Sequence, residues 1–304
     1  MQPFKVIVLG CGSALPTLRH GASSQVVEVR NKAFMIDCGE GTQVQLRKAR
    51  VHFNKITTVF ISHLHGDHCF GLIGMISSFG MLGRTAPLHI YAHSQLGPLL
   101  DMQLDMFCQK LEYDVIFHPI ETSESKIIYE DSGVEVSTIP LDHRVDCCGF
   151  LIKEKPTLPH LRRDMMDFYG IPLCYRNNIK AGADWTDSEG NVIQNSRLTQ
   201  PADAPRSYAY CSDTRYMPGL WKKLKGVDVL YHEATYCEDY DKLAAKYHHS
   251  TASEAAMTAR DAGVGKLIIG HYSARYQDES VFLKEAREVF PDTYLADEMM
   301  VFNV

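Results

Sequence analysis

The sequence predicts an α/β protein that is organised as one domain over residues 1–304. A hydrophobic content of 45% is enough to build a large core in a chain of this length. Short apolar runs typical of buried strands alternate with segments of helical periodicity. Several of these runs end directly at His, Asp or Glu, as is typical of an open site on a rigid scaffold. We therefore expect a functional site along one rim of a pair of sheets.

The expected elements follow one another along the chain with short connections. Apolar runs bounded by turn residues indicate strands, and apolar residues at helical spacing indicate helices. The predicted strands are 4–9, 26–29, 33–36, 59–61, 88–92, 115–119, 134–140, 149–153, 207–212, 227–231 and 266–270. The predicted helices are 43–48, 70–79, 95–106, 253–262 and 279–289, and two short strands close the chain.

The loop after the first predicted strand begins like a dinucleotide-binding loop, with glycines at 10 and 12. Leu15 stands where such a loop requires a third glycine, and residues 24–29 alternate like a strand instead of opening a helix. Dinucleotide binding is therefore excluded.

Composition and charge narrow the possible location and partners. The N-terminal apolar run covers only Val6 to Leu9, and no apolar run approaches the roughly 18 residues of a membrane span. Nine irregularly spaced cysteines fit reduced buried thiols, so we expect a cytoplasmic protein, and the adjacent Cys147 and Cys148 are not expected to pair. With a net charge of −6, binding to nucleic acid would need a local basic feature.

Four potential metal ligands gather at residues 63–68, His-Leu-His-Gly-Asp-His. His63 and His65 project to one side of an extended backbone, and Gly66 permits a turn that brings Asp67 and His68 back toward them. Imidazole and carboxylate are ligands for Zn²⁺, Mn²⁺ or Fe, and the lack of a Cys pair with metal spacing favours an open site over a sealed structural one. The alternative is a histidine-rich surface turn, because the chain has 14 histidines.

Further candidate ligands follow later strands. The patterns place His143, Asp213 and His271 at such strand ends, which makes seven candidate donors with the four at residues 63–68. The pair His232-Glu233 also ends an apolar run but is not counted among these donors. Seven donors are too many for one tetrahedral ion and suit two ions that share a carboxylate. We expect His63, His65 and His143 at one ion, Asp67, His68 and His271 at the other, and Asp213 between them. Asp37 either orients a ligand histidine or caps a turn, and both interpretations stay open.

Residues 154–205 differ from the rest of the chain. They contain prolines at 156, 159, 172, 201 and 205, which indicate an insertion that leaves the core. From Lys153 to Lys180, six basic residues stand against three acidic ones. This segment is either an ordinary solvated loop or the local basic feature that an acidic protein needs for nucleic acid.

Taken together, the motifs resemble a known family. The pattern His63-x-His65-x-Asp67-His68 with the later His143, Asp213 and His271 is similar to the metallo-β-lactamase superfamily, which implies a four-layer αββα sandwich. Adding the motifs His232-Glu-Ala-Thr235, His249-Ser-Thr251 and Gly270-His-Tyr-Ser-Ala-Arg-Tyr276 gives a pattern that resembles the short form of ribonuclease Z. That endonuclease removes the 3′ trailer from precursor tRNA.

The resemblance implies cofactors, partners and residue roles. It implies two Zn²⁺ per subunit, precursor tRNA as the substrate, and a homodimer. Asp67 would be a zinc ligand and the proton acceptor for the attacking water, and His249 would donate a proton to the leaving 3′ oxygen. Glu233 could orient His249. The alternative for His249 is a purely structural residue at the start of the following helix, beside the cap formed by Ser250 and Thr251.

The segment 154–205 falls where this family carries a protruding arm that grips the tRNA elbow. Its candidate substrate-binding residues are Arg162, Arg163, Arg176 and Lys180. Two stretches depart from the family pattern: Pro16–Gly21 replaces a Pro-x-Lys-x-Arg-Asn loop, and Pro172–Tyr175 lacks the usual Gly-Pro step. These departures bear on how the protein treats mature CCA ends and on how it grips tRNA. They leave the metal chemistry untouched.

Two other functions are alternatives to a tRNA endonuclease. The first is a phosphodiesterase of the same superfamily that acts on small substrates and uses the insertion for something else. The second is a metal-stabilised RNA-binding or partner protein without turnover, against which the intact ligand set and His249 argue.

Overall fold

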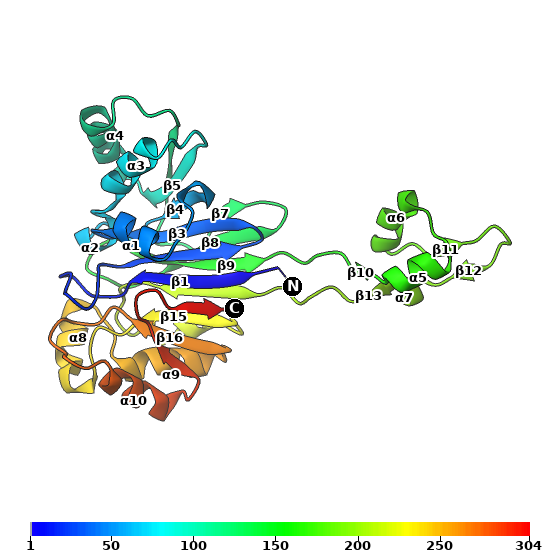
Figure 1. The fold of residues 1–304 in the computed structure, drawn as a ribbon. Coiled ribbons are helices and arrows are strands. Elements are labelled where there is room, and N and C mark those ends of the chain that lie inside the picture. Colours follow the sequence, from blue (N-terminus) through cyan, green and yellow to red (C-terminus); the bar gives the residue numbers. More distant parts are fainter. Residues whose placement is uncertain (1) are drawn as a thin grey trace. The chain divides into compact units, whose positions relative to one another are not determined.

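Two seven-stranded sheets form the centre of the chain in the computed structural model, which describes residues 2–304 (Figure 1). The first sheet has the order β18-β1-β2-β3-β4-β5-β6, and the second has the order β17-β16-β15-β14-β9-β8-β7. The strands of the first sheet are β1 (Phe4–Gly10), β2 (Ser24–Val29), β3 (Lys32–Cys38), β4 (Ile56–Phe60), β5 (Leu88–His93), β6 (Val115–Ile120) and β18 (Val301–Asn303). Those of the second are β7 (Ile127–Glu130), β8 (Val134–Pro140), β9 (Cys148–Glu154), β14 (Ser207–Cys211), β15 (Val229–Glu233), β16 (Lys266–Gly270) and β17 (Thr293–Leu295).

Alternation along the strands explains the layers. In β1, Val6 and Val8 join the core between the sheets, whereas Ile7 and Leu9 join a second core beneath the helices of the first sheet. A strand with apolar residues on both faces must be covered on both sides. The second sheet is covered by α9 (Ala252–Ala262) and α10 (Ser280–Val289) (Figure 1). The predicted four-layer αββα sandwich is confirmed.

This part of the chain has five further helices among the described residues. They are α1 (Thr42–Lys48), α2 (Gly66–Cys69), α3 (Leu72–Met81), α4 (Leu96–Phe107) and α8 (Asp241–Tyr247), with 3₁₀ turns η1 (Phe53–Lys55), η3 (Leu220–Lys222) and η4 (Glu238–Tyr240). Within residues 2–304, no helix combines the length and the apolar composition that a membrane span requires.

The predicted helix 70–79 is wrong at its start, because two separate helices occupy this region. Helix α2 ends at Cys69, and α3 begins only at Leu72. Gly71 lies between them, where its backbone N–H donates to the Cys38 carbonyl at 2.9 Å. A Cβ at this glycine would lie 2.0 Å from the Gly39 carbonyl oxygen, so the chain turns against β3 at a point where only glycine fits.

Strand β15 also differs from the prediction, since it runs to Glu233 instead of ending at Tyr231. His232 and Glu233 therefore lie in the strand, and both are fully buried. The ladder with β16 continues through the pair Glu233 and Gly270, which keeps these residues in register with the neighbouring parallel strand.

Residues Glu154–Pro205 form a compact unit that is separate from the rest of the chain. Its elements are β10 (His160–Leu161), α5 (Arg163–Phe168), η2 (Leu173–Tyr175), α6 (Arg176–Lys180), β11 (Trp185–Thr186), β12 (Val192–Ile193), α7 (Asn195–Leu198) and β13 (Thr199–Gln200). A small core holds them together, composed of Met166, Ile171, Ile179, Ile193 and Leu198. This unit is therefore a folded element with its own apolar centre.

Candidate metal centre

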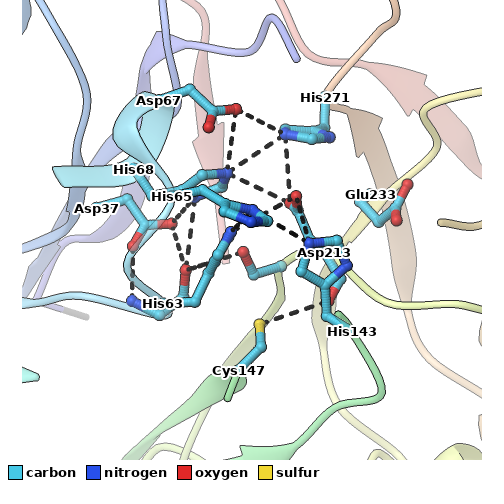
Figure 2. A network of polar contacts seen from close by, with 12 residues as sticks. Asp37, His63, His65, Asp67, His68, His143, Cys147, Asp213, Glu233 and His271 are labelled. Atoms are coloured by element: carbon cyan, nitrogen blue, oxygen red, sulfur yellow. Dashed lines mark hydrogen bonds and ion pairs between the residues drawn. The ribbon is translucent and has the colours of Figure 1, made fainter. Parts of the chain in front are cut away.

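The seven predicted donors meet at one edge of the two sheets (Figure 2). His63, His143, Asp213 and His271 follow strands, as the sequence predicts, whereas His65 precedes α2 and both Asp67 and His68 lie in it. Their potential ligand atoms form two groups, in each of which all atoms lie within 4.8 Å of one another. One group is His63, His65, His143 and Asp213, and the other is Asp67, His68 and His271.

The carboxylate of Asp213 lies between the two groups. Its Oδ2 is 3.7 Å from His63 Nε2 and 3.8 Å from His143 Nε2. Its Oδ1 is 3.2 Å from His271 Nε2 and 3.4 Å from His68 Nε2. One oxygen thus faces each group, which is the geometry that a carboxylate shared by two ions requires.

Hydrogen bonds on the far side of three histidine rings set their tautomers. The Nδ1 of His143 donates to the His248 carbonyl oxygen at 2.9 Å, since a carbonyl can only accept. The Nδ1 of His68 lies 2.7 Å from Asp37 Oδ2, and the Nδ1 of His271 lies 2.9 Å from the Thr235 hydroxyl. With the proton on Nδ1, each Nε2 presents a lone pair to the centre.

These lone pairs face one another without a donor between them. The Nε2 atoms of His68 and His271 are 3.3 Å apart. Oδ1 of Asp213 is buried and accepts no hydrogen bond from any of the described residues. Lone pairs and a buried carboxylate pointed at one space repel one another unless a cation lies there. The residues therefore fit a bound metal cation.

The charge state of the ring nitrogens agrees with that fit. Burial lowers the pKa of His63, His65 and His143, so these rings are neutral, which is the form that binds metal. Burial also lowers the pKa of His68, but the charges of Asp213 and Asp37 outweigh it and raise that pKa well above its usual value. Without a cation this raised pKa keeps a second proton on His68, and a metal ion bound at the second group would displace that proton from Nε2.

Asp37 is a buried carboxylate that orients His68. One of its oxygens accepts from the backbone N–H of Ser62 at 2.7 Å, and the other accepts from the Ser62 hydroxyl at 2.9 Å. That second oxygen also accepts from the Tyr210 hydroxyl at 2.8 Å and contacts His68 Nδ1. Of the two interpretations left open by the sequence, the contacts favour the orienting carboxylate. Nothing in the sequence indicated Tyr210, which comes from β14 of the other sheet.

His249 and Glu233 form a second pair beside the metal groups. The Nδ1 of His249 is 2.9 Å from Glu233 Oε1, and Glu233 is fully buried. Burial lowers the pKa of His249, but the charge of Glu233 and its hydrogen bond outweigh burial and raise that pKa to about 9. The His249 ring is therefore protonated near neutral pH. It also stands just before α9, whose first turn is closed by the capping box of Thr251 and Glu254.

A cavity of about 450 Å³ opens onto these groups. Asp67, Asp213, His249 and His271 line it together with His65. Apolar residues and a glycine line other parts of it, namely Ala14, Leu15, Pro16, Gly66 and Phe70. A phosphoryl group could therefore reach both metal groups and the protonated ring of His249 in one place.

Some predicted features lie outside the centre. His232 belongs to neither donor group, and its Nδ1 contacts the Glu233 carbonyl oxygen at 2.7 Å. Its prediction as a residue that follows a strand is wrong, because β15 is two residues longer than its apolar run. Cys147 and Cys148 are both free thiols, and Cys147 donates to the Asp213 carbonyl oxygen at 3.4 Å.

The four predicted substrate-binding residues all lie in the unit Glu154–Pro205. Arg162 forms an ion pair with Asp164 at 2.9 Å, and Arg176 lies 4.0 Å from Asp167. Arg163 and Lys180 make no ion pair with any described residue. The whole unit has six basic and seven acidic residues, so it has no excess of positive charge. Basic residues outnumber acidic ones only in the part before residue 181.

Comparison with known proteins identifies the family. A ribonuclease Z of Bacteroides fragilis is 55% identical over 304 residues, which cover 100% of both chains. The chain belongs to the ribonuclease Z family. A family model described as anti-Pycsar protein Apyc1 also matches residues 4–159 of the present chain, a range that ends before Asp213, His249 and His271.

Solved structures support the same fold. The short form of human tRNase Z is 22% identical with a TM-score of 0.71, and the match covers 98% of each chain. The metallo-β-lactamase fold protein YhfI of Bacillus subtilis is 20% identical with a TM-score of 0.68 over 100% of each chain. The family and fold inferred from the sequence are confirmed, and with them a metal-dependent hydrolase of the ribonuclease class.

The role of Asp37 predicts a loss of metal affinity in Asp37→Asn. The amide can no longer attract the His68 Nδ1 proton with a full charge, so the ring loses its fixed orientation. We expect about 10- to 100-fold weaker metal binding, measured by competition with a chelating dye. Asp228→Asn is the matched control, because that carboxylate accepts hydrogen bonds from Ser207 at the other end of β14 and β15. Equal metal affinity in Asp37→Asn and the wild type would refute the orienting role.

Proposed function

We propose that this chain is a zinc-dependent endoribonuclease that removes the 3′ trailer from precursor tRNA and leaves a 3′-hydroxyl. One observation carries the proposal: two His/Asp groups share the carboxylate of Asp213 beside the protonated ring of His249, in a chain with full-length similarity to ribonuclease Z. We further propose that it acts in the cytoplasm, in keeping with its nine free cysteines, and that it forms a homodimer, in keeping with the family resemblance.

The proposed cofactor is two Zn²⁺ per subunit. His63, His65 and His143 would hold one ion, and Asp67, His68 and His271 would hold the other, with Asp213 contributing to both. Imidazole and carboxylate donors without a thiolate suit Zn²⁺ in an open catalytic site. When bound, such ions polarise a phosphoryl group and lower the pKa of water.

We assign one proton transfer to Asp67 and another to His249. Burial favours a protonated Asp67, but hydrogen bonds with His271 and His68 outweigh it and lower its pKa well below the usual range. Asp67 is therefore ionised, the form in which a carboxylate binds metal. We assign it as the group that orients the attacking water and accepts its proton, in keeping with the family resemblance. His249 is protonated, and we assign it as the donor to the leaving 3′ oxygen, while Glu233 holds its ring in place.

We propose that the unit Glu154–Pro205 grips the tRNA far from the bond that is cut. Arg163 and Lys180 are the best candidates for phosphate contacts, since Arg162 and Arg176 already face acidic neighbours. The unit also exposes apolar residues, including Phe168 and Leu173. Because phosphate contacts release counterions, binding should weaken as salt rises.

The test of this function is cleavage of an end-labelled precursor tRNA, with the cut mapped at nucleotide resolution. We expect one cut at the 3′ trailer junction, loss of the cut with a chelator, and recovery when Zn²⁺ is added. His249→Ala is the matched inactive variant, expected to keep its metal and to cut roughly 10²- to 10⁴-fold more slowly. Cleavage of small phosphodiesters without any cut in the precursor would instead favour a small-substrate phosphodiesterase. Loss of metal in His249→Ala would make His249 a ligand.

The proposed grip predicts that the unit is needed for tRNA and not for chemistry. Lys153 of β9 and Ser207 of β14 are antiparallel partners, so a short Asn-Gly turn can replace residues 155–205 and close a hairpin. We expect this variant to lose cleavage of precursor tRNA and to keep hydrolysis of an aryl phosphodiester. Retention of precursor cleavage, or an equal loss of both activities in a folded variant, would contradict the grip.

A further inference from the structure

An exposed aromatic ring stands at the rim of the metal cavity. Phe70 lines the cavity beside Gly66 and Asp67, and 72% of its surface is exposed. Single exposed apolar residues are common on protein surfaces. This one lies three residues from Asp67, a member of the second metal group, and lines the same cavity, so a substrate bound there can contact it.

The ring is held in place by the backbone of the ligand loop. Its edge lies where a side chain at Gly66 would be, because a Cβ there would come within 2.3 Å of the ring. The Phe70 backbone N–H also donates to the Gly66 carbonyl oxygen at 2.9 Å and closes the turn of α2. Glycine at position 66 thus lets the ring rest against the loop while most of its surface faces solvent.

A second apolar surface lines the same cavity. Leu15 is 70% exposed and follows Ala14, whose backbone N–H donates to Asp67 Oδ2 at 2.8 Å. The Phe70 ring packs against Gly66, the neighbour of Asp67, and Leu15 is the neighbour of Ala14, which donates to Asp67. The cavity combines polar residues with apolar ones near Asp67. An unpaired nucleotide suits such a cavity, because the π face of its base can contact the apolar residues while its phosphate contacts the polar ones.

We propose that Phe70 stacks on the first nucleobase of the trailer and positions the bond that is cut, an inference that rests on the proposed function. The upstream nucleotide must lie against His249, because its 3′ oxygen takes the proton from that ring. The nucleotide that keeps the phosphate is the first one of the trailer. Among the described residues that line the cavity, Phe70 is the one with an aromatic carbocycle on which that base can stack.

The test measures kcat/KM for a normal precursor tRNA and for two versions that lack one base each. One version is abasic at the first trailer nucleotide, and the other is abasic at the last nucleotide before the cut. We expect Phe70→Ala to cut the normal precursor at least about tenfold more slowly, in line with the loss of one stacked base. Phe70→Trp should keep the activity, because it keeps a ring.

The abasic precursors identify the base. With the trailer base removed, wild type and Phe70→Ala should cut at the same reduced rate, whereas with the upstream base removed the difference between them should persist. Phe107→Ala is the matched control, since Phe107 is 67% exposed and lies at the end of α4, outside the residues that line the cavity. Equal rates of Phe70→Ala and wild type on the normal precursor, or a difference that disappears only with the upstream base, would overturn the inference. If the wild type fails to cut the normal precursor, the proposed function itself is wrong.

Discussion

The buried carboxylate of Asp213 is the group on which the candidate metal centre depends. It follows β14, and each of its oxygens faces one group of histidines. The two sheets, face to face, supply ligands to both sides of this carboxylate. His63 follows a strand of the first sheet, whereas His143, Asp213 and His271 follow strands of the second. The sandwich is therefore the frame that brings the two halves of the site together.

Hydrogen bonds behind the ligands make the centre suitable for metal. His68, His143 and His271 each have Nδ1 bonded to a different acceptor: a carboxylate, a backbone carbonyl and a hydroxyl. Each bond fixes one ring and turns its lone pair toward the centre. The hydroxyl of Thr235 is itself held, because it donates to Glu233 Oε2 at 2.8 Å.

Glu233 links the metal ligands to the proton donor. One of its oxygens contacts His249, and the other accepts from Thr235, which in turn contacts His271. A change at this carboxylate would therefore disturb a ligand and the acid together. The same residue also accepts the backbone N–H groups of Thr214 and Ser250, so the loops after β14 and before α9 are fixed to one point.

The local part of the site was predictable from the sequence. His63, His65, Asp67 and His68 are close in the chain, and period-two geometry followed by a glycine turn is enough to bring them together. His143, Asp213 and His271 were predictable because each follows an apolar run, and strand ends gather at one edge of a sheet.

Other features depend on contacts between distant elements, which local patterns do not contain. The bond from Tyr210 to Asp37 joins the two sheets, so nothing near either residue indicates it. The break between α2 and α3 arises from the close approach of Gly71 to Gly39, and helical periodicity continues through it. His232 was misplaced because apolar runs mark a strand's core and not its last residues. The net charge of the unit Glu154–Pro205 depends on acidic residues beyond the positive segment on which the prediction rested.

Anomalous diffraction at the zinc absorption edge, from crystals grown with Zn²⁺, tests the central claim most directly. The account predicts two peaks per chain, each about 2.0–2.2 Å from its ligand atoms, with one oxygen of Asp213 at each peak. A single peak, or two peaks of which only one touches Asp213, would contradict a centre built around a shared carboxylate.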